Sequence, residues 1–524
     1  MHRLVVALVT LLGLTGAAVV AAYLLLFSAG TDRAARLAPA DTAFYVNVYL
    51  QPSAGQQMNL SQLIGRFPGF ADDATLDDKV DQVVQNLLAG SGVDYRRDVK
   101  PWLGNQVALA VWPSAGTDIA DAQPVVLAEV KDREAAEASI ESLVPDGSAF
   151  RTETHDGVAL HVSSETTYAF VEEMLVLGPD PAGVRRVIDV SRGADALADR
   201  DDFQRTMRDM PSDHLASAFV DLAAVAEEAD VAEQLSAVST AGAVLVAEEA
   251  GLRLSGSAPF DVERADPSAR AAFVMSREPS SLTEWMPPTT IAEVVIFGLR
   301  QTLEDAEAAA RATPDGQELT SALDTFRAIA AFGLGIDLDA DVLPLFDREV
   351  AIALTGFRGD LPSGQLLLRP DDPGAAGAGL ARITERLTAV GATTREHEMP
   401  GGTATVIGVP EVGEVAYVVT DAGIIIFAFG TEDLAAAVDA HDRGTSLAST
   451  EAYRRTFDTA GIRAGNEAWI DVRALVALMQ ADAELDADTR DILGQIGTLG
   501  FTAPSREDHI EFHAVLTVEE TRPD

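Results

Sequence analysis

The stretch Leu197-Ala-Asp-Arg-Asp-Asp-Phe-Gln-Arg-Thr-Met207 occurs a second time, with changes, as Leu447-Ala-Ser-Thr-Glu-Ala-Tyr-Arg-Arg-Thr-Phe457, 250 residues later. Phe219-Val-Asp221 corresponds to Trp469-Ile-Asp471 at the same spacing. Self-similarity at a fixed spacing indicates that one structural unit is present more than once. We therefore expect two homologous units in this chain.

An earlier pair of segments and a polar stretch set the extent of the two units. Pro101-Trp-Leu-Gly104 and the apolar run after it match Pro344-Leu-Phe-Asp347 and its own apolar run. The polar stretch from Asp261 to Ser281 contains two prolines and is typical of a linker. The expected domains are an N-terminal segment at 1–30, a first unit at 31–260, a linker at 261–283 and a second unit at 284–524.

The N-terminal segment contains an apolar run of 24 residues without a charge, Leu4 to Phe27. A helix of about 20 such residues spans a bilayer, whereas the apolar core of a cleaved signal peptide has only about 7–15. The run predicts a single-pass signal anchor, so the lipid bilayer is an expected partner through Leu4–Phe27. Cleavage after Ser28-Ala-Gly30 is the alternative. The short leading tail favours placing the bulk of the chain outside the cytoplasm, at the cell membrane.

Periodicity predicts the same order of elements in each unit. Ala43 to Leu50 alternates between apolar and polar residues, as a half-buried strand does. Apolar residues at helical spacing predict helices at Val80–Leu88 and at Leu319–Ala330, each with one apolar face. Asp156-Gly157 lies between two strand-like runs and predicts a tight hairpin. The expected fold class is α+β, with mainly antiparallel sheet and helices on one face.

Composition excludes several classes of function. Hydrophobic residues make up 47% of the chain and charged ones 23%, which is typical of a folded protein. The formal net charge of −44 disfavours binding to nucleic acid or to anionic lipid headgroups. Cys is absent, so disulfides, Cys-based zinc sites and thiol nucleophiles are excluded. The acidity suits either adaptation to high salt or simple solubility.

The candidate metal ligands in the sequence are His509, Glu511 and His513. They alternate along the last expected strand, so their side chains project from one face, and two imidazoles with a carboxylate are able to ligate zinc. The residues between them are apolar and would face the core, which favours an ordinary polar exterior instead. His155 and His161 flank the expected hairpin, but no third ligand converges on them in the sequence.

Two acidic segments resemble the start of a calcium loop. Asp337-Leu-Asp-Ala-Asp341 has Val342 where an EF-hand needs Gly and Arg348 where it needs Glu. The segment at 482–488 also lacks the Gly. Solvated loops are the preferred interpretation of both, with loose binding of divalent ions as the alternative.

Other conspicuous residues have structural explanations, and catalytic motifs are missing from the sequence. Asp221 and Asp471 each follow an expected strand and precede a helix-like run, which predicts helix capping. Trp102 is expected to pack in the core. The sequence contains no Gly-x-Ser-x-Gly elbow, no His-Glu-x-x-His and no phosphate-binding loop. We therefore expect no enzyme activity, no catalytic residue and no cofactor.

Several segments together are similar to one family. They are the N-terminal anchor, Pro39-Ala-Asp-Thr-Ala-Phe-Tyr-Val46, Val99-Lys-Pro-Trp-Leu-Gly104 and the phrase around Leu197. They resemble a family of uncharacterised bacterial membrane-anchored proteins known only as a domain of unknown function. The resemblance covers nearly all of 37–520 and implies a protein of the cell envelope, without a catalytic residue or a ligand.

The expected function is that of a membrane-tethered extracytoplasmic binding or scaffold protein of the bacterial cell envelope. One alternative is a carrier or acceptor of a lipid or another apolar ligand, because curved sheets covered by helices are able to enclose such a ligand. The other alternative is an unrecognised hydrolase. The expected partner is a protein or an apolar ligand, and no nucleic acid.

Overall fold

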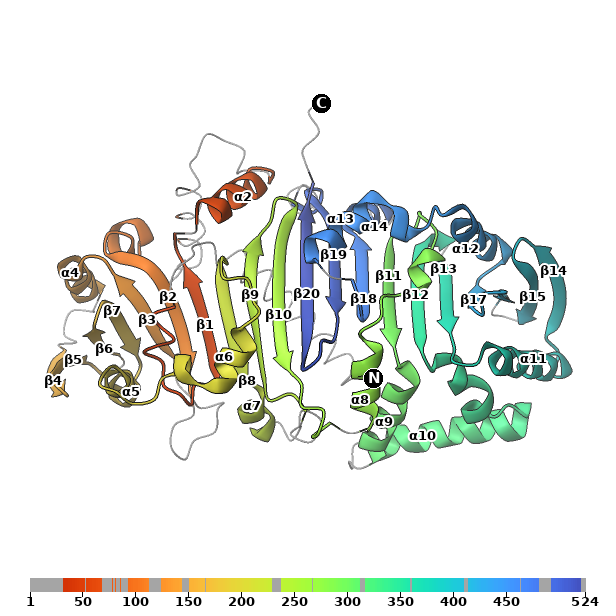
Figure 1. Ribbon diagram of the computed structural model, residues 1–524, viewed down its shortest axis with the longest axis horizontal. Helices are drawn as coiled ribbons and strands as arrows, with labels where there is room; N and C mark the ends of the chain where they lie inside the picture. The colour runs from red at the N-terminus through yellow and green to blue at the C-terminus, as the bar shows by residue number, and fades with distance from the viewer. Residues whose placement is uncertain are drawn as a thin grey trace. The chain divides into compact units, whose positions relative to one another are not determined.

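The computed structural model (Figure 1) describes part of the chain. It describes residues 32–519 apart from 52, 68–77, 79, 80, 82–84, 86–92, 113–123, 144–149, 165, 229–236, 266, 312–315, 359, 360, 410–412, 462 and 480–491. The expected anchor Leu4–Phe27, most of the expected helix Val80–Leu88 and the acidic segment 482–488 lie outside the described residues. Within the described part, no helix combines the length and the apolar character needed to cross a membrane.

The chain forms two compact units, each with its own core. The first unit contains the described residues up to Arg264 together with Asp508–Ala514. The second contains Ala265–Glu507 and Val515–Glu519. The stretch expected to be a linker includes helix α8 (Pro267–Met275), whose Phe273 side chain is buried in the second unit. Strand β20 (His509–Val518) supplies its first part to the first unit and its last part to the second.

The first unit is built on one antiparallel sheet. In spatial order its strands are β4 (Arg151–His155), β5 (Val158–Val162), β6 (Thr167–Val171), β7 (Met174–Gly178), β3 (Val125–Val130), β2 (Leu103–Val111), β1 (Phe44–Tyr49), β8 (Ala216–Asp221), β9 (Thr240–Ala247) and β10 (Gly251–Pro259). Every strand pair whose register is described is antiparallel, as expected.

The second unit has the same strand order. Its strands are β14 (Thr393–Met399), β15 (Gly402–Val409), β16 (Gly413–Val419), β17 (Ile425–Ala428), β13 (Leu361–Arg369), β12 (Glu349–Arg358), β11 (Ala292–Phe297), β18 (Asn466–Asp471) and β19 (Ile496–Ala503). Corresponding strands therefore have corresponding neighbours in the two units. In the first unit β8 pairs with β1, and in the second β18 pairs with β11.

In the sequence, the helices occur between these strands. In the first unit they are α2 (Ala54–Ile64), α4 (Arg133–Leu143), α5 (Pro181–Ser191), α6 (Asp201–Met207) and α7 (Leu222–Glu228). In the second unit they are α8, α9 (Leu299–Arg311), α10 (Gly316–Ile329), α11 (Pro373–Ala389), α12 (Thr431–Arg443), α13 (Glu451–Ala460) and α14 (Val472–Met479). The mixed α+β class is thus confirmed.

Helices cover both faces of the first sheet rather than one face as expected. Val176 in β7 belongs to the core cluster that includes Ile188 of α5. Its neighbour Leu175 belongs to a second cluster, with Ala136 of α4. Successive residues in a strand point to opposite faces, so α5 and α4 lie on opposite sides. The expectation was wrong because strands such as β7 are apolar on both faces and need cover on both.

The predicted hairpin is confirmed at the edge of the first sheet. Asp156 and Gly157 join β4 to β5 with φ angles of 44° and 82°. Two successive positive φ angles are typical of a type I′ turn, which matches the natural twist of a hairpin. This turn places the end of β4 next to the C-terminal end of helix α5. At the other end of α5, the carboxylate of the N-cap residue Asp180 accepts hydrogen bonds from two backbone N–H groups of the first turn.

Candidate functional site

Helices α9 and α10 lie side by side in the second unit (Figure 1) and are joined through charged side chains. Arg327 donates hydrogen bonds of 2.5 and 2.7 Å to the two carboxylate oxygens of Glu307. Arg311 pairs with Glu307 and with Asp324. Hydrogen bonding to Arg327 lowers the pKa of Glu307, so this carboxylate stays ionised. The pairing order shows that the two helices are antiparallel and that their polar faces meet.

The other face of α10 is apolar and open to solvent. Leu319, Leu323, Phe326 and Ile329 follow one another at helical spacing, and Phe332 continues the row in the π-helical turn η5 (Ala330–Leu334). Their exposed fractions are 48%, 38%, 59%, 60% and 93%. We call these five side chains the α10 stripe. An amphipathic helix ordinarily buries such a face against the protein core. In α10 this arrangement is reversed, because the charged face packs inside and the apolar face is exposed.

The helix at Leu319–Ala330 was predicted correctly, but its environment was not. Of the four apolar positions in the sequence pattern, Ala330 is buried, whereas Leu319, Leu323 and Phe326 are exposed. The physical reason is that α9 occupies the charged face of α10 through Arg327. Periodicity reports which residues share a face, and it does not report which face a neighbour covers.

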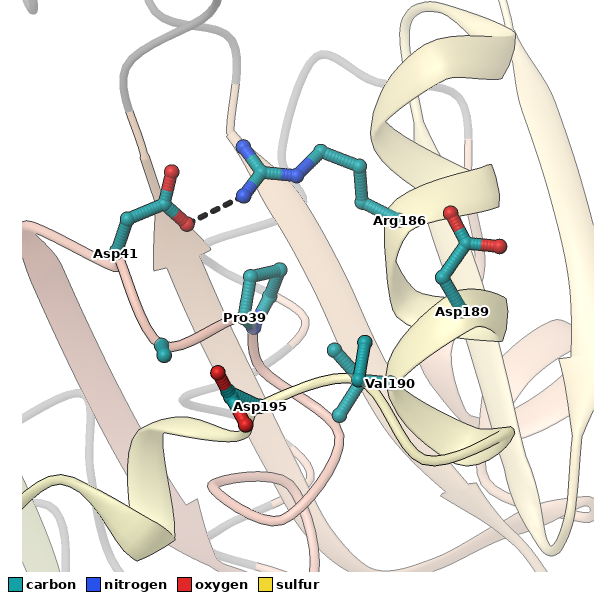
Figure 2. A pocket seen from close by; sticks show the side chains of 8 residues that line it. Pro39, Asp41, Arg186, Asp189, Val190 and Asp195 are labelled. Atoms are coloured by element: carbon teal, nitrogen blue, oxygen red, sulfur yellow. Dashed lines mark hydrogen bonds and ion pairs between the residues drawn. The ribbon is translucent and has the colours of Figure 1, made fainter.

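A separate cavity of about 310 Å³ lies at the C-terminal end of α5 in the first unit. Its lining combines three aspartates and one arginine with four apolar residues, and consists of Pro39, Ala40, Asp41, Arg186, Asp189, Val190, Ala194 and Asp195 (Figure 2). The Arg186 guanidinium reaches across to Asp41, to which it donates a hydrogen bond, and lies 5.6 Å from the centre of the Trp112 ring. The carboxylates of Asp189 and Asp195 stand apart from that pair. This lining suits a polar or cationic ligand better than a lipid.

Asp189 also contacts the β4–β5 hairpin. Its Oδ1 lies 2.6 Å from Nε2 of His155. Asp156 is the next residue of the turn, and potential ligand atoms of His155, Asp156 and Asp189 all lie within 4.8 Å of one another. Asp189 is therefore the residue that the sequence did not reveal as a possible ligand beside His155. It is 34 residues from His155 along the chain. His161 does not take part, because its ring stacks on Tyr168 with 4.5 Å between ring centres.

His509, Glu511 and His513 share one face of β20, as their alternation predicted. Nε2 of His509 lies 3.3 Å from Oε1 of Glu511, and Nε2 of His513 lies 3.5 Å from Oε2 of the same carboxylate. Nδ1 of His513 lies 3.1 Å from the hydroxyl oxygen of Ser255 in β10. The expected exterior position is wrong for His513, which is only 8% exposed. His513 is the buried member of this row and has Ser255 of the neighbouring strand β10 beside it, whereas His509 and Glu511 are half-buried.

The capping residues behave as predicted. Asp221 accepts a hydrogen bond from the backbone N–H of Ala224 at 3.1 Å, at the start of α7. Asp471 accepts one from Ala474 at 2.8 Å, at the start of α14. Each carboxylate satisfies a backbone donor that the first turn of a helix leaves free.

Trp102 and the acidic loop near Asp337 also have structural partners. Trp102 is 8% exposed and donates its indole N–H to the carbonyl oxygen of Asp98 at 2.6 Å, which confirms the packing role. Asp337 caps the next turn by accepting from two backbone N–H groups. Asp341 forms a pair with Arg382 at 2.6 Å. These two carboxylates are held by the protein's own donors.

Sequence reasoning missed a buried pair of carboxyl groups in the second unit. Glu293 in β11 is 2% exposed, and within the described part of the chain neither of its side-chain oxygens has a hydrogen-bond partner. Burial raises the pKa of Glu293 well above its ordinary value, and the nearby Glu467 raises it further. Glu467 accepts a hydrogen bond from the Tyr453 hydroxyl. The only signal in the sequence was one acidic residue within an apolar strand.

The two units of antiparallel sheet, each with helices on it, define an α+β protein. Comparison with known families then identifies it further: a family model described as "Protein of unknown function (DUF3352)" matches residues 4–519, and the chain belongs to this family. The predicted membership of a family known only as a domain of unknown function is thereby confirmed.

Other comparisons add little. No curated protein matches the chain. Among solved structures, crystal form IV of TP0453 is 10% identical with a TM-score of 0.27, and the alignment covers 46% of this chain and 83% of that one. Crystal form III of TP0453 is 11% identical with a TM-score of 0.26, with coverage of 46% and 84%. Likeness at this level is too low to transfer a function.

Proposed function

We propose that this chain is a membrane-tethered extracytoplasmic binding or scaffold protein of the bacterial cell envelope, and that it binds a partner protein through the α10 stripe. The observation that supports this proposal is the inverted polarity of α10, whose charged face is used inside the molecule and whose apolar face is exposed. Each large apolar side chain that moves from water into a groove contributes about 1.5–3 kcal/mol. Spacing at i, i+4 and i+7 is the pattern of a helix that docks into an apolar groove.

The charges around the stripe define the chemistry of the partner. Glu318 lies on α10 itself, and the whole chain carries a formal charge of −44. Such a surface repels anionic lipid headgroups and a second copy of the same chain. The surface that fits is therefore the apolar face of a helix on another protein, with Lys and Arg at its rim.

Two further parts of the proposal rest on the sequence. The Leu4–Phe27 run supports a membrane anchor that holds both units outside the cytoplasm. The repeated phrases and the shared strand order support an origin of the two units by duplication. The carrier alternative gains no support from the described cavity, since half of its lining residues are charged.

The proposal is tested with the full chain in detergent and a defined probe. The probe is a synthetic amphipathic helical peptide with Leu at i, i+4 and i+7 and Lys at both rims, and its fluorescence anisotropy reports binding. We expect the double substitution Phe326→Glu and Ile329→Glu to weaken binding at least tenfold. Ser321→Glu, at an exposed position on the other side of α10, is the matched control and should bind as the wild type does.

Three outcomes contradict the proposal. Equal binding by the wild type and the double variant removes the role of the stripe. Equal binding of a peptide with Glu at its rims removes the charge argument. Flotation with vesicles of neutral phosphatidylcholine, or a dimer by light scattering, that is lost in the double variant replaces the protein partner by a lipid surface or a second copy. A photo-crosslinking residue at Phe332 in intact cells then identifies the partner.

A further inference from the structure

We propose that His155, Asp156 and Asp189 form a binding site for a divalent transition-metal ion, with zinc as the best fit. The site lies where the β4–β5 hairpin meets helix α5 in the first unit. It is independent of the α10 stripe, so the proposal stands or falls separately from the proposed function.

The distances between the ligand atoms suit one small ion. All three residues offer a ligand atom within 4.8 Å of the others, and His155 and Asp189 are already 2.6 Å apart. Zinc binds nitrogen and carboxylate oxygen at about 2.0–2.2 Å, so tetrahedral ligands around it lie roughly 3.3 Å apart. Small side-chain rotations therefore convert the hydrogen-bonded pair into a metal-bound pair, in which the ion replaces the shared proton.

The backbone holds these ligands on two firmly placed elements. Asp156 has a φ of 44° in the tight turn, which keeps its carboxylate beside His155 at the tip of the hairpin. Asp189 lies on α5, which is fixed by the buried side chains Val187 and Ile188. Ligands carried by packed elements lose little further freedom on binding, which favours affinity.

The surroundings favour a dication. Asp195 and Asp189 both line the adjoining cavity, and Arg186, the cation in that lining, is already paired with Asp41. Three carboxylates and one guanidinium therefore give the cavity lining a net negative charge. An imidazole nitrogen in the ligand set favours zinc and related transition metals over calcium and magnesium, which prefer oxygen alone.

Three protein ligands leave one tetrahedral position open, and the cavity beside Asp189 gives water or a small anion access to it.

A bound ion also stabilises an edge of the sheet, because the β4–β5 hairpin contains the outermost strand β4. Binding to the folded state alone stabilises that state by mass action. Zinc should therefore slow local opening of this hairpin.

The test uses the full chain in detergent after treatment with a chelator. Titration with zinc sulfate against a fluorescent zinc indicator should give one ion per chain, and His155→Ala and Asp189→Asn should each weaken binding at least thirtyfold. His397→Ala, an exposed histidine of β14, is the matched control and should leave binding unchanged. Co²⁺ in place of zinc should give an intense tetrahedral visible spectrum that changes in His155→Ala.

A second measurement separates metal binding from a simple hydrogen-bonded latch. Hydrogen exchange in peptides of 151–162 should slow on addition of zinc in the wild type and stay unchanged in His155→Ala. Zinc that binds no more tightly to the wild type than to His155→Ala overturns the proposal and leaves the His155–Asp189 contact as a latch. Loss of binding in His509→Ala alone also overturns it, and moves the site to the β20 row.

Discussion

Glu293 shows how one residue governs local stability through its protonation. Its carboxyl group is enclosed in the second unit with no hydrogen-bond partner among the described residues, and its pKa is raised by burial and by Glu467. An isolated buried charge is costly, so burial shifts this group toward its protonated form in the folded chain. The unfolded chain loses that proton above its ordinary pKa of about 4.5.

The sign of the resulting pH dependence follows directly. The contribution of Glu293 to stability is fully present below pH 4.5 and is lost as the pH rises toward the raised pKa of the folded state. The substitution Glu293→Gln keeps the size and shape of the side chain and removes its ionisable carboxyl group. We expect it to stabilise the second unit at pH 8 by on the order of 1 kcal/mol and to change little at pH 5.

Hydrogen exchange of β11 peptides at the two pH values measures this effect, with Glu396→Gln at an exposed position of β14 as the control. The same slope of stability against pH in the Glu293→Gln variant and in the wild type would show that Glu293 is already ionised in the folded chain.

At the scale of elements, the β4–β5 hairpin depends on backbone conformation at its turn. Gly157 has a φ of 82°, and a Cβ built there meets no atom within 4 Å. The cost of Gly157→Ala therefore comes from the backbone alone, and we expect a loss of about 1 kcal/mol.

Gly55→Ala in the first turn of α2 is the control, because the added Cβ there makes only an ordinary contact of 3.8 Å and φ is not in the left-handed region. Urea unfolding followed by exchange in β4 and β5 compares the two variants. Equal stability of Gly157→Ala and Gly55→Ala contradicts the assignment of the turn.

Helix α10 illustrates what element-scale patterns leave open. The spacing of Leu319, Leu323 and Phe326 is sufficient to predict a helix with one apolar face. It is not sufficient to predict exposure, because the side on which α9 packs is chosen by Arg327 and Glu307. An ion pair between two helices, such as Arg327–Glu307, produces no periodic pattern in the sequence. It therefore cannot be predicted from hydrophobic spacing.

For the whole molecule, the excess of carboxylates is the dominant electrostatic feature. A formal charge of −44 repels itself, and at 0.01 M salt this repulsion reaches about 30 Å, whereas at 1 M it reaches about 3 Å. We expect the melting temperature of the full chain to rise markedly between these two salt concentrations. Thermal scans in NaCl check this, with a neutral osmolyte as the control, and a flat response rejects an adaptation to high salt.

The sequence by itself determined the α+β class, the hairpin at Asp156-Gly157, the caps Asp221 and Asp471, and the family resemblance. These follow from local periodicity, turn chemistry and repeated phrases, all of which act over a few residues.

Only the tertiary structure decided which side chains meet and which face is covered. Asp189 joins His155 because α5 packs beside the hairpin, Ser255 contacts His513 because β20 lies next to β10, and the α10 stripe is exposed because α9 takes the polar face. The position of helices on both faces of the first sheet was likewise decided by tertiary packing. Contacts between residues far apart in sequence depend on packing of the whole unit, and local patterns do not encode it.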